Sequence, residues 1–174
     1  MNAVLELAAL PGGAAARMAA AYGAELVELP RDAKIPGSYW GAPEAGLVRA
    51  CVYVRPDTPV HSFLHELCHY VCMDEARRVA LTKDAGGDDD EECAVCYLQL
   101  VLAAELPGFG LERALDDMDA WGYSFREGSA RAWLAGDARF ARAWLVRHNI
   151  VDRRGAPTWS LRAAGNGGGR RRQL

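Results

Sequence analysis

The chain has 174 residues, of which 51% are hydrophobic and 25% are charged, as expected for one globular domain with an apolar core. Its formal net charge of −3 gives no electrostatic reason to expect nucleic acid or an anionic membrane surface as a partner. Its five cysteines are an odd number, which favours a reduced, cytoplasmic protein over a disulfide framework. No stretch approaches the roughly 18 uninterrupted apolar residues of a membrane-spanning helix.

The first part of the chain predicts a short helix followed by strands. Residues 14–23 are rich in alanine, and Gly23 is placed to end a helix. Residues 24–30 have the composition of a strand that ends at a proline. Residues 37–41 and 46–56 are rich in β-branched and aromatic residues between glycines and prolines, so we expect them to pair as antiparallel strands.

The middle of the chain predicts two long helices. Apolar residues recur at helical spacing up to about Met73, and Asp57 or Thr58, just before Pro59, suits a helix N-cap. A polar, glycine-containing loop then leads to a second helix at residues 91–106, which a proline and a glycine end.

Shorter helices are expected after this point, at residues 111–120, at 130–135 after Ser129 and at 138–148 after Asp137. The end of the chain is rich in glycine and arginine, and it cannot bury enough apolar surface to fold.

Together these elements predict one α+β domain over residues 1–150. A sheet of about three short strands, antiparallel or mixed, is expected to pack on the two long helices, with a helical part after them. Residues 151–174 are expected to form a C-terminal tail that is disordered from about residue 163.

The stretch "HSFLHELCHYVC" at residues 61–72 contains three of the four histidines. His65 and His69 lie one turn apart on the predicted helix, so each can direct a ring nitrogen at one metal ion. Glu66 lies beside them, where its carboxylate can take a proton from a water at the open metal position. This H-E-x-x-H pattern predicts one Zn²⁺ per chain, with Glu66 as the catalytic base.

A catalytic zinc site needs a third protein ligand and one exchangeable position. No further histidine follows at a suitable spacing, so a carboxylate from the acidic run before the second helix is the natural third ligand. Asp88, Asp89 and Asp90 suit the capping and solvation of a helix N-terminus. Glu91 and Glu92, inside the first turn, are therefore the candidate ligands.

Other polar residues of the two helices could hold the ligands in place or contact substrate. His61 and Tyr70 are the candidates on the histidine helix. The group that stabilises the oxyanion of a peptide-hydrolysis intermediate stays open among His61, Tyr70, Tyr97, Tyr123 and His148.

The motifs "HELCH" at 65–69 and "EECAVCYLQLVL" at 91–102 resemble those of small gluzincins, the compact zinc metallopeptidases of the ImmA/IrrE type and related minimal gluzincins. The resemblance implies a zincin-like fold with a catalytic core at residues 14–106 and a helical extension at 107–150. In those families, a second helix supplies the ligand glutamate in its first turn. The register of the second motif fits Glu92 as that ligand better than Glu91, because small and apolar residues follow it at the family's positions: Cys93, Cys96, Leu100 and Val101.

The sequence also departs from the family. Many gluzincins have an aspartate that orients a ligating histidine at the position of Cys96, and a glycine at the position of Cys68. No DNA-binding module like that of the regulator-cleaving relatives is recognisable.

Three functions follow as hypotheses. The first is a zinc-dependent endopeptidase acting on a peptide or protein substrate. The second is a non-catalytic protein with a structural or sensory zinc site, in which Cys93 and Cys96 join the two histidines. The third is a pseudo-peptidase that binds a peptide without cutting it. The sequence determines neither the substrate nor the oligomeric state.

Overall fold

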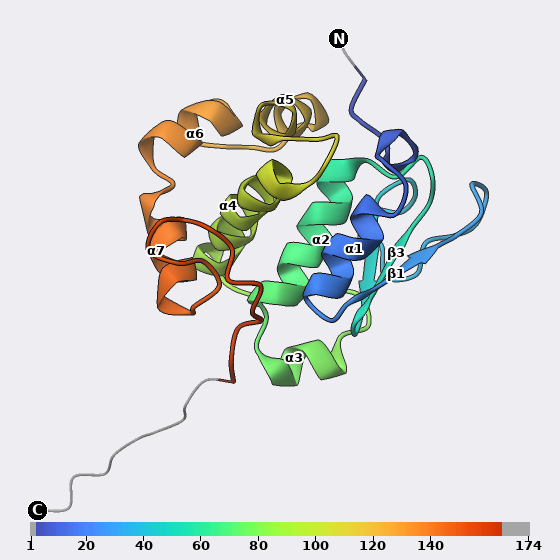
Figure 1. Ribbon diagram of the computed structural model, residues 1–174, viewed down its shortest axis with the longest axis horizontal. Coiled ribbons are helices and arrows are strands. Elements are labelled where there is room, and N and C mark those ends of the chain that lie inside the picture. Colours follow the sequence, from blue (N-terminus) through green and yellow to red (C-terminus); the bar gives the residue numbers. More distant parts are fainter. Residues whose placement is uncertain (1–2, 165–174) are drawn as a thin grey trace, which may run out of the picture.

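The computed structural model describes residues 3–164 and shows an α+β fold, which confirms the predicted class (Figure 1). Within the described residues, seven α-helices accompany a mixed sheet of three strands. The N-terminal half contains α1 (Ala14–Ala21), β1 (Glu25–Glu28), β2 (Gly46–Val48), β3 (Cys51–Val54), α2 (Val60–Cys72) and α3 (Glu75–Ala80). The C-terminal half contains α4 (Asp89–Glu105), α5 (Leu111–Trp121), α6 (Ala130–Gly136) and α7 (Arg139–Arg147).

The sheet has the strand order β1-β3-β2. The central strand β3 runs parallel to β1 and antiparallel to β2. Val52 and Val54 alternate along β3 and are fully buried, because successive side chains of a strand point to opposite faces and this face packs on α2. The short strands therefore provide a platform for the histidine helix.

The predicted strand at residues 37–41 was wrong. Gly37 and Gly41 both have positive φ, and the backbone N–H of Gly41 donates to the hydroxyl of Ser38, so the segment forms turns. The antiparallel hairpin lies instead wholly within the predicted strand 46–56, which bends at Arg49 with a φ of 52°. Local β propensity indicated the strand, but the glycines at both ends set the backbone.

Helix α2 lies between the sheet and α4, and α7 covers the far side of α4 (Figure 1). The apolar residues of α2 that define the predicted helical spacing are fully buried: Val60, Phe63, Leu64, Leu67 and Val71. The predicted cap was wrong, since Pro59 occupies the N-cap position and Thr58 accepts a hydrogen bond from the backbone of Arg55 instead. No side chain caps this helix.

Helix α4 begins two residues earlier than expected. The carboxylate of Asp88 accepts a hydrogen bond from the backbone N–H of Glu91, as the capping role predicted for it requires. The four acidic residues of the first turn also interact favourably with the positive end of the helix dipole. Ser129 caps α6 as predicted, whereas Asp137 lies at the C-terminal end of α6 and Ala138 precedes α7.

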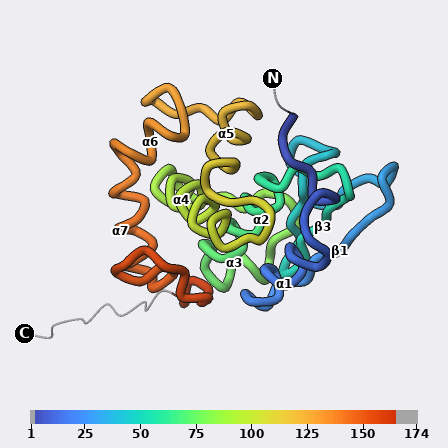
Figure 2. The backbone as a smooth tube through the Cα atoms, turned by 45° about the horizontal axis from the view of Figure 1, so that its top comes forward, coloured from blue at the N-terminus to red at the C-terminus, as the bar shows by residue number. Residues whose placement is uncertain are grey.

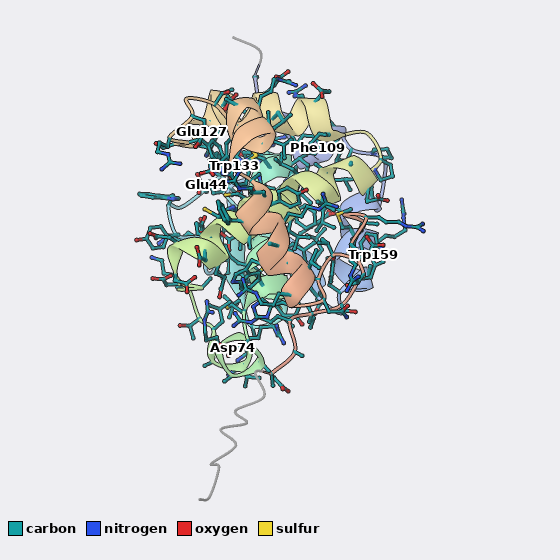
Figure 3. The ribbon with its side chains drawn as sticks, turned by 90° about the vertical axis from the view of Figure 1, so that its left-hand side faces the viewer. Glu44, Asp74, Phe109, Glu127, Trp133 and Trp159 are labelled. Atoms are coloured by element: carbon teal, nitrogen blue, oxygen red, sulfur yellow. The ribbon has the colours of Figure 1, made fainter. Side chains whose placement is uncertain are left out.

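The chain continues beyond α7 along the domain (Figure 2). Val151 is buried and forms a bridge with Pro157. Trp159, labelled in Figure 3, packs against Tyr22, the C-cap residue of α1, with ring centroids 5.4 Å apart. The backbone N–H of Arg162 donates to the carbonyl of Val71 at 2.9 Å. Residues 151–162, assigned to the tail from sequence, thus belong to the folded domain. The disorder expected from about residue 163 falls almost wholly outside the described residues.

The described helices also bear on the membrane prediction. None of them combines the length and the apolar composition needed to cross a membrane.

Candidate metal centre

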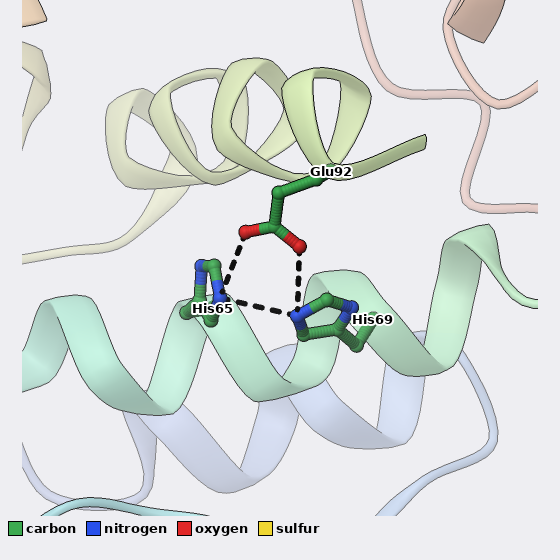
Figure 4. A group of neighbouring side chains, drawn as sticks. All are labelled: His65, His69 and Glu92. Carbon is green, nitrogen blue, oxygen red and sulfur yellow. Dashed lines mark hydrogen bonds and ion pairs between the residues drawn. The ribbon is translucent and has the colours of Figure 1, made fainter. Parts of the chain in front are cut away.

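His65 and His69 face α4 from adjacent turns of α2, and Glu92 faces them from the first turn of α4 (Figure 4). The Nε2 atoms of the two histidines are 3.1 Å apart, and their rings are perpendicular. The carboxylate of Glu92 lies across both rings, with Oε1 3.4 Å from Nε2 of His65 and Oε2 3.5 Å from Nε2 of His69. Three predicted ligands therefore converge from two helices.

These separations match the requirements of a tetrahedral metal site. An ion with bonds of about 2.0–2.1 Å holds its ligand atoms roughly 3.3–3.4 Å apart. The three distances of 3.1, 3.4 and 3.5 Å bracket that value. The group His65, His69 and Glu92 can thus hold a metal ion, and within the described part of the chain no other group of His, Cys, Asp or Glu side chains does so.

Gln99 fixes the orientation of His65, a role that the sequence did not reveal. Its amide nitrogen donates to the carbonyl of His61 at 2.9 Å, so its oxygen faces Nδ1 of His65 at 3.2 Å and accepts a hydrogen bond from the Nδ1–H group. The proton on Nδ1 leaves Nε2 with a free lone pair that points at Glu92 and His69. Gln99 lies two turns after Glu92 on the same helix face, which is the one signal that could have found it.

Two histidines at this site, His61 and His69, are buried. Burial, with nearby His65 and Arg77, lowers the pKa of His69 well below its usual range. Burial, with His65, lowers the pKa of His61 to about 3. A neutral imidazole is the form that ligates a metal, so burial of His69 disfavours the proton that would compete with the ion there.

Glu66 lies outside the group of three and lines the pocket next to it. Burial, with the negative charges of Glu44 and Glu92, raises the pKa of Glu66 to about 8. Its carboxylate therefore has a greater proton affinity than an ordinary glutamate. The structure gives Glu66 no ion pair with any described arginine, lysine or histidine.

An open pocket of about 850 Å³ leads to this group from solvent. Of the five candidates for oxyanion stabilisation, His61 and Tyr123 line the pocket, and Tyr123 places its hydroxyl 3.5 Å from Nδ1 of His61. The other three do not line it. Tyr70 is buried and packs against Arg78, Tyr97 lies beside α7, and His148 packs against Trp144.

The alternative ligands lie elsewhere. Glu91 is buried and forms ion pairs with Arg77 and Arg162, so its carboxylate is turned away from the histidines. Neither Cys93 nor Cys96 belongs to the group of three; Cys93 is exposed, and Cys96 packs in the core. Cys96 lies one turn after Glu92, but it packs in the core instead of joining the three ligand atoms.

The donor set is thus two imidazoles and one carboxylate, beside a second carboxylate and an open pocket. Comparison of the chain with protein-family models, with curated proteins and with solved structures gives no match. Chemically, nitrogen and oxygen ligands of this kind suit Zn²⁺ with one position left for water or substrate.

Proposed function

We propose that the protein is a zinc-dependent metallopeptidase of the gluzincin type. The observation that carries this proposal is the convergence of His65, His69 and Glu92 at tetrahedral separations, with Glu66 beside them in an open pocket. A closed structural zinc site would have four protein ligands, whereas three were found here among the described residues. The exchangeable position is what hydrolysis requires.

Bound Zn²⁺ would supply Lewis acidity toward a peptide carbonyl and toward the attacking water. Glu66 takes the proton from that water and passes it to the leaving amine, a role that needs a carboxylate near the metal but not on it. Gln99 keeps Nε2 of His65 unprotonated and aimed at the ion.

For the stabilisation of the oxyanion we propose Tyr123. It lines the pocket, and burial raises the pKa of its hydroxyl, so the hydroxyl keeps its proton and can donate it in a hydrogen bond. Its ring stands edge-on to His65, with centroids 5.8 Å apart, which puts it beside the metal ligands. His61, buried behind it, positions this hydroxyl through Nδ1.

The test is hydrolysis of a broad peptide library by the zinc-loaded protein, with mass spectrometry of the products. We expect cleavage that a chelator abolishes and Zn²⁺ restores. The variant Glu66→Gln should keep one zinc per chain and lose cleavage by at least a hundredfold, because an amide cannot accept the proton of water. The matched control Glu105→Gln, on the exposed end of α4, should cleave like the parent. Zinc loss in Glu66→Gln would make Glu66 a ligand and refute this mechanism.

A further inference from the structure

The pocket above the metal group is acidic. Besides Glu66 and Glu92, four carboxylates line it against one basic side chain, that of Lys83: Glu44, Asp84, Asp88 and Asp89. None of these four forms an ion pair with a lysine or arginine of residues 3–164. Several negative charges in a partly enclosed pocket add up to a strong negative electrostatic potential, which favours a cationic ligand.

Aromatic side chains form another part of the pocket wall. Trp40 and Trp121 line it with exposed fractions of 80% and 39%, and Tyr39 packs edge-on against Trp40. The faces of exposed indole rings attract lysine and arginine side chains through cation–π interaction. Large exposed aromatic residues beside a site are costly to leave in water, which indicates that a ligand covers them.

A hydrogen bond links Trp121 to Glu44 in the wall of the pocket. The indole N–H of Trp121 donates to Oε1 of Glu44 at 2.8 Å, so the second carboxylate oxygen, Oε2, stays available beside the ring. This pairing offers a guanidinium group both of the surfaces that it uses in proteins, a flat aromatic face and a carboxylate. The hydrogen bond holds the two in a fixed relation before a ligand arrives.

A buried polar atom also points to a ligand next to this pair. The ring of His61 lies 5.1 Å from that of Trp121, and His61 is only 1% exposed. No described residue forms a hydrogen bond with its Nε2 atom, although His61 lines the pocket. A buried polar atom without a partner costs free energy, and a peptide amide of a bound ligand would satisfy it.

We infer that the pocket selects peptides that carry arginine or lysine beside the bond to be cleaved, with Glu44 as the specificity-determining carboxylate and Trp121 as the surface on which the basic side chain lies. The cleavage in this inference rests on the proposed function, but the selectivity of peptide binding can be measured without it. Glu44, Trp121 and Glu66 line the same pocket, so a basic side chain held there lies close to the metal group.

The experiment compares short acetylated and amidated peptides that differ in one central residue: arginine, lysine, norleucine or glutamate. For the zinc-loaded protein, we expect kcat/KM to favour arginine over norleucine by roughly tenfold or more, as an ion pair with a cation–π contact would give. This preference should shrink as salt concentration rises. Glu44→Gln should bring the ratio close to one, and Glu44→Lys should make the glutamate peptide the better substrate. The control Glu105→Gln should leave the ratio unchanged.

A binding measurement separates this inference from the proposed function. Isothermal titration of the zinc-loaded Glu66→Gln variant with the same peptides gives their dissociation constants without cleavage. Tighter binding of the arginine peptide that depends on Glu44 would support the inference even if the parent cleaves nothing, in which case only the proposed function fails. Equal dissociation constants for the arginine, norleucine and glutamate peptides would overturn the inference, even if the parent is an active peptidase.

Discussion

Glu91 and Glu92 are neighbours in the first turn of α4, yet they have opposite surroundings. The side chain of Glu91 is 6% exposed and lies between two arginines, with contacts of 2.8 Å to Arg77 and 2.9 Å to Arg162. The side chain of Glu92 is 51% exposed and faces the imidazoles of His65 and His69. Glu91 thus forms ion pairs with two arginines, whereas Glu92 forms none with a lysine or arginine among the described residues.

The difference shows how a step of one residue within a helix turn separates a structural role from a ligand role. Consecutive residues of a helix are rotated by about 100°, so only one of the two can face α2. Glu91 ties the first turn of α4 to α3 through Arg77 and to the C-terminal segment through Arg162. These ties fix the rotation of α4, and with it the direction in which Glu92 points. Four experiments test this comparison.

The largest effect should follow removal of a ligand. His65→Ala, His69→Ala and Glu92→Ala should each lose zinc after dialysis, because two remaining ligands bind the ion poorly. Inductively coupled plasma mass spectrometry measures the zinc content, with about one zinc per chain expected in the parent. Zinc should also raise the melting temperature of the parent and leave that of the three variants unchanged. Full occupancy in all three would refute the site.

Removal of the neighbouring glutamate should act on stability instead. Glu91→Ala should lower the free energy of unfolding by about 3 kcal/mol, because Arg77 and Arg162 are left partly buried without their counter-charge. Urea denaturation of the metal-free protein measures this change, with Glu105→Ala as the exposed control. The folded Glu91 variant should still take up one zinc per chain. Loss of zinc without loss of stability would mean that Glu91 and Glu92 have exchanged roles.

A smaller effect is expected at Gln99. Gln99→Leu removes the acceptor of the Nδ1 proton of His65 while filling much of the same volume, so zinc affinity should fall by roughly 10–100-fold. Competition with a chromophoric chelator measures the dissociation constant. Unchanged affinity would show that the tautomer of His65 is set by another group.

The smallest effect is expected at the cysteines of α4. Cys93→Ser and Cys96→Ser should leave zinc occupancy unchanged, since neither belongs to the ligand group. X-ray absorption at the zinc edge should show nitrogen and oxygen scatterers at ~2.0–2.1 Å and no sulfur at ~2.3 Å. A sulfur shell, or zinc loss in either variant, would instead favour a structural site of histidines and cysteines.

Sequence patterns predicted most of the helices because these depend on local rules. Apolar residues at helical spacing located α2 and α4 within a few residues, and Ser129 marked the start of α6. The errors arose where local preference competed with the surrounding structure. Residues 37–41 have strand composition but form turns, and Arg162, in a segment assigned to the tail, is held by Glu91 and by the carbonyl groups at the end of α2.

The sequence by itself determined the pair His65 and His69 and the position of Glu66 beside it, because spacing along one helix fixes which side chains share a face. Only the tertiary structure decided that Glu92 rather than Glu91 completes the group, that Gln99 orients His65, and that Tyr123 and His61 line the pocket while Tyr70 does not. Each of these depends on how α4 and the segment after α5 are rotated against α2. That rotation is set by packing and ion pairs between residues far apart in the chain, which no local pattern records.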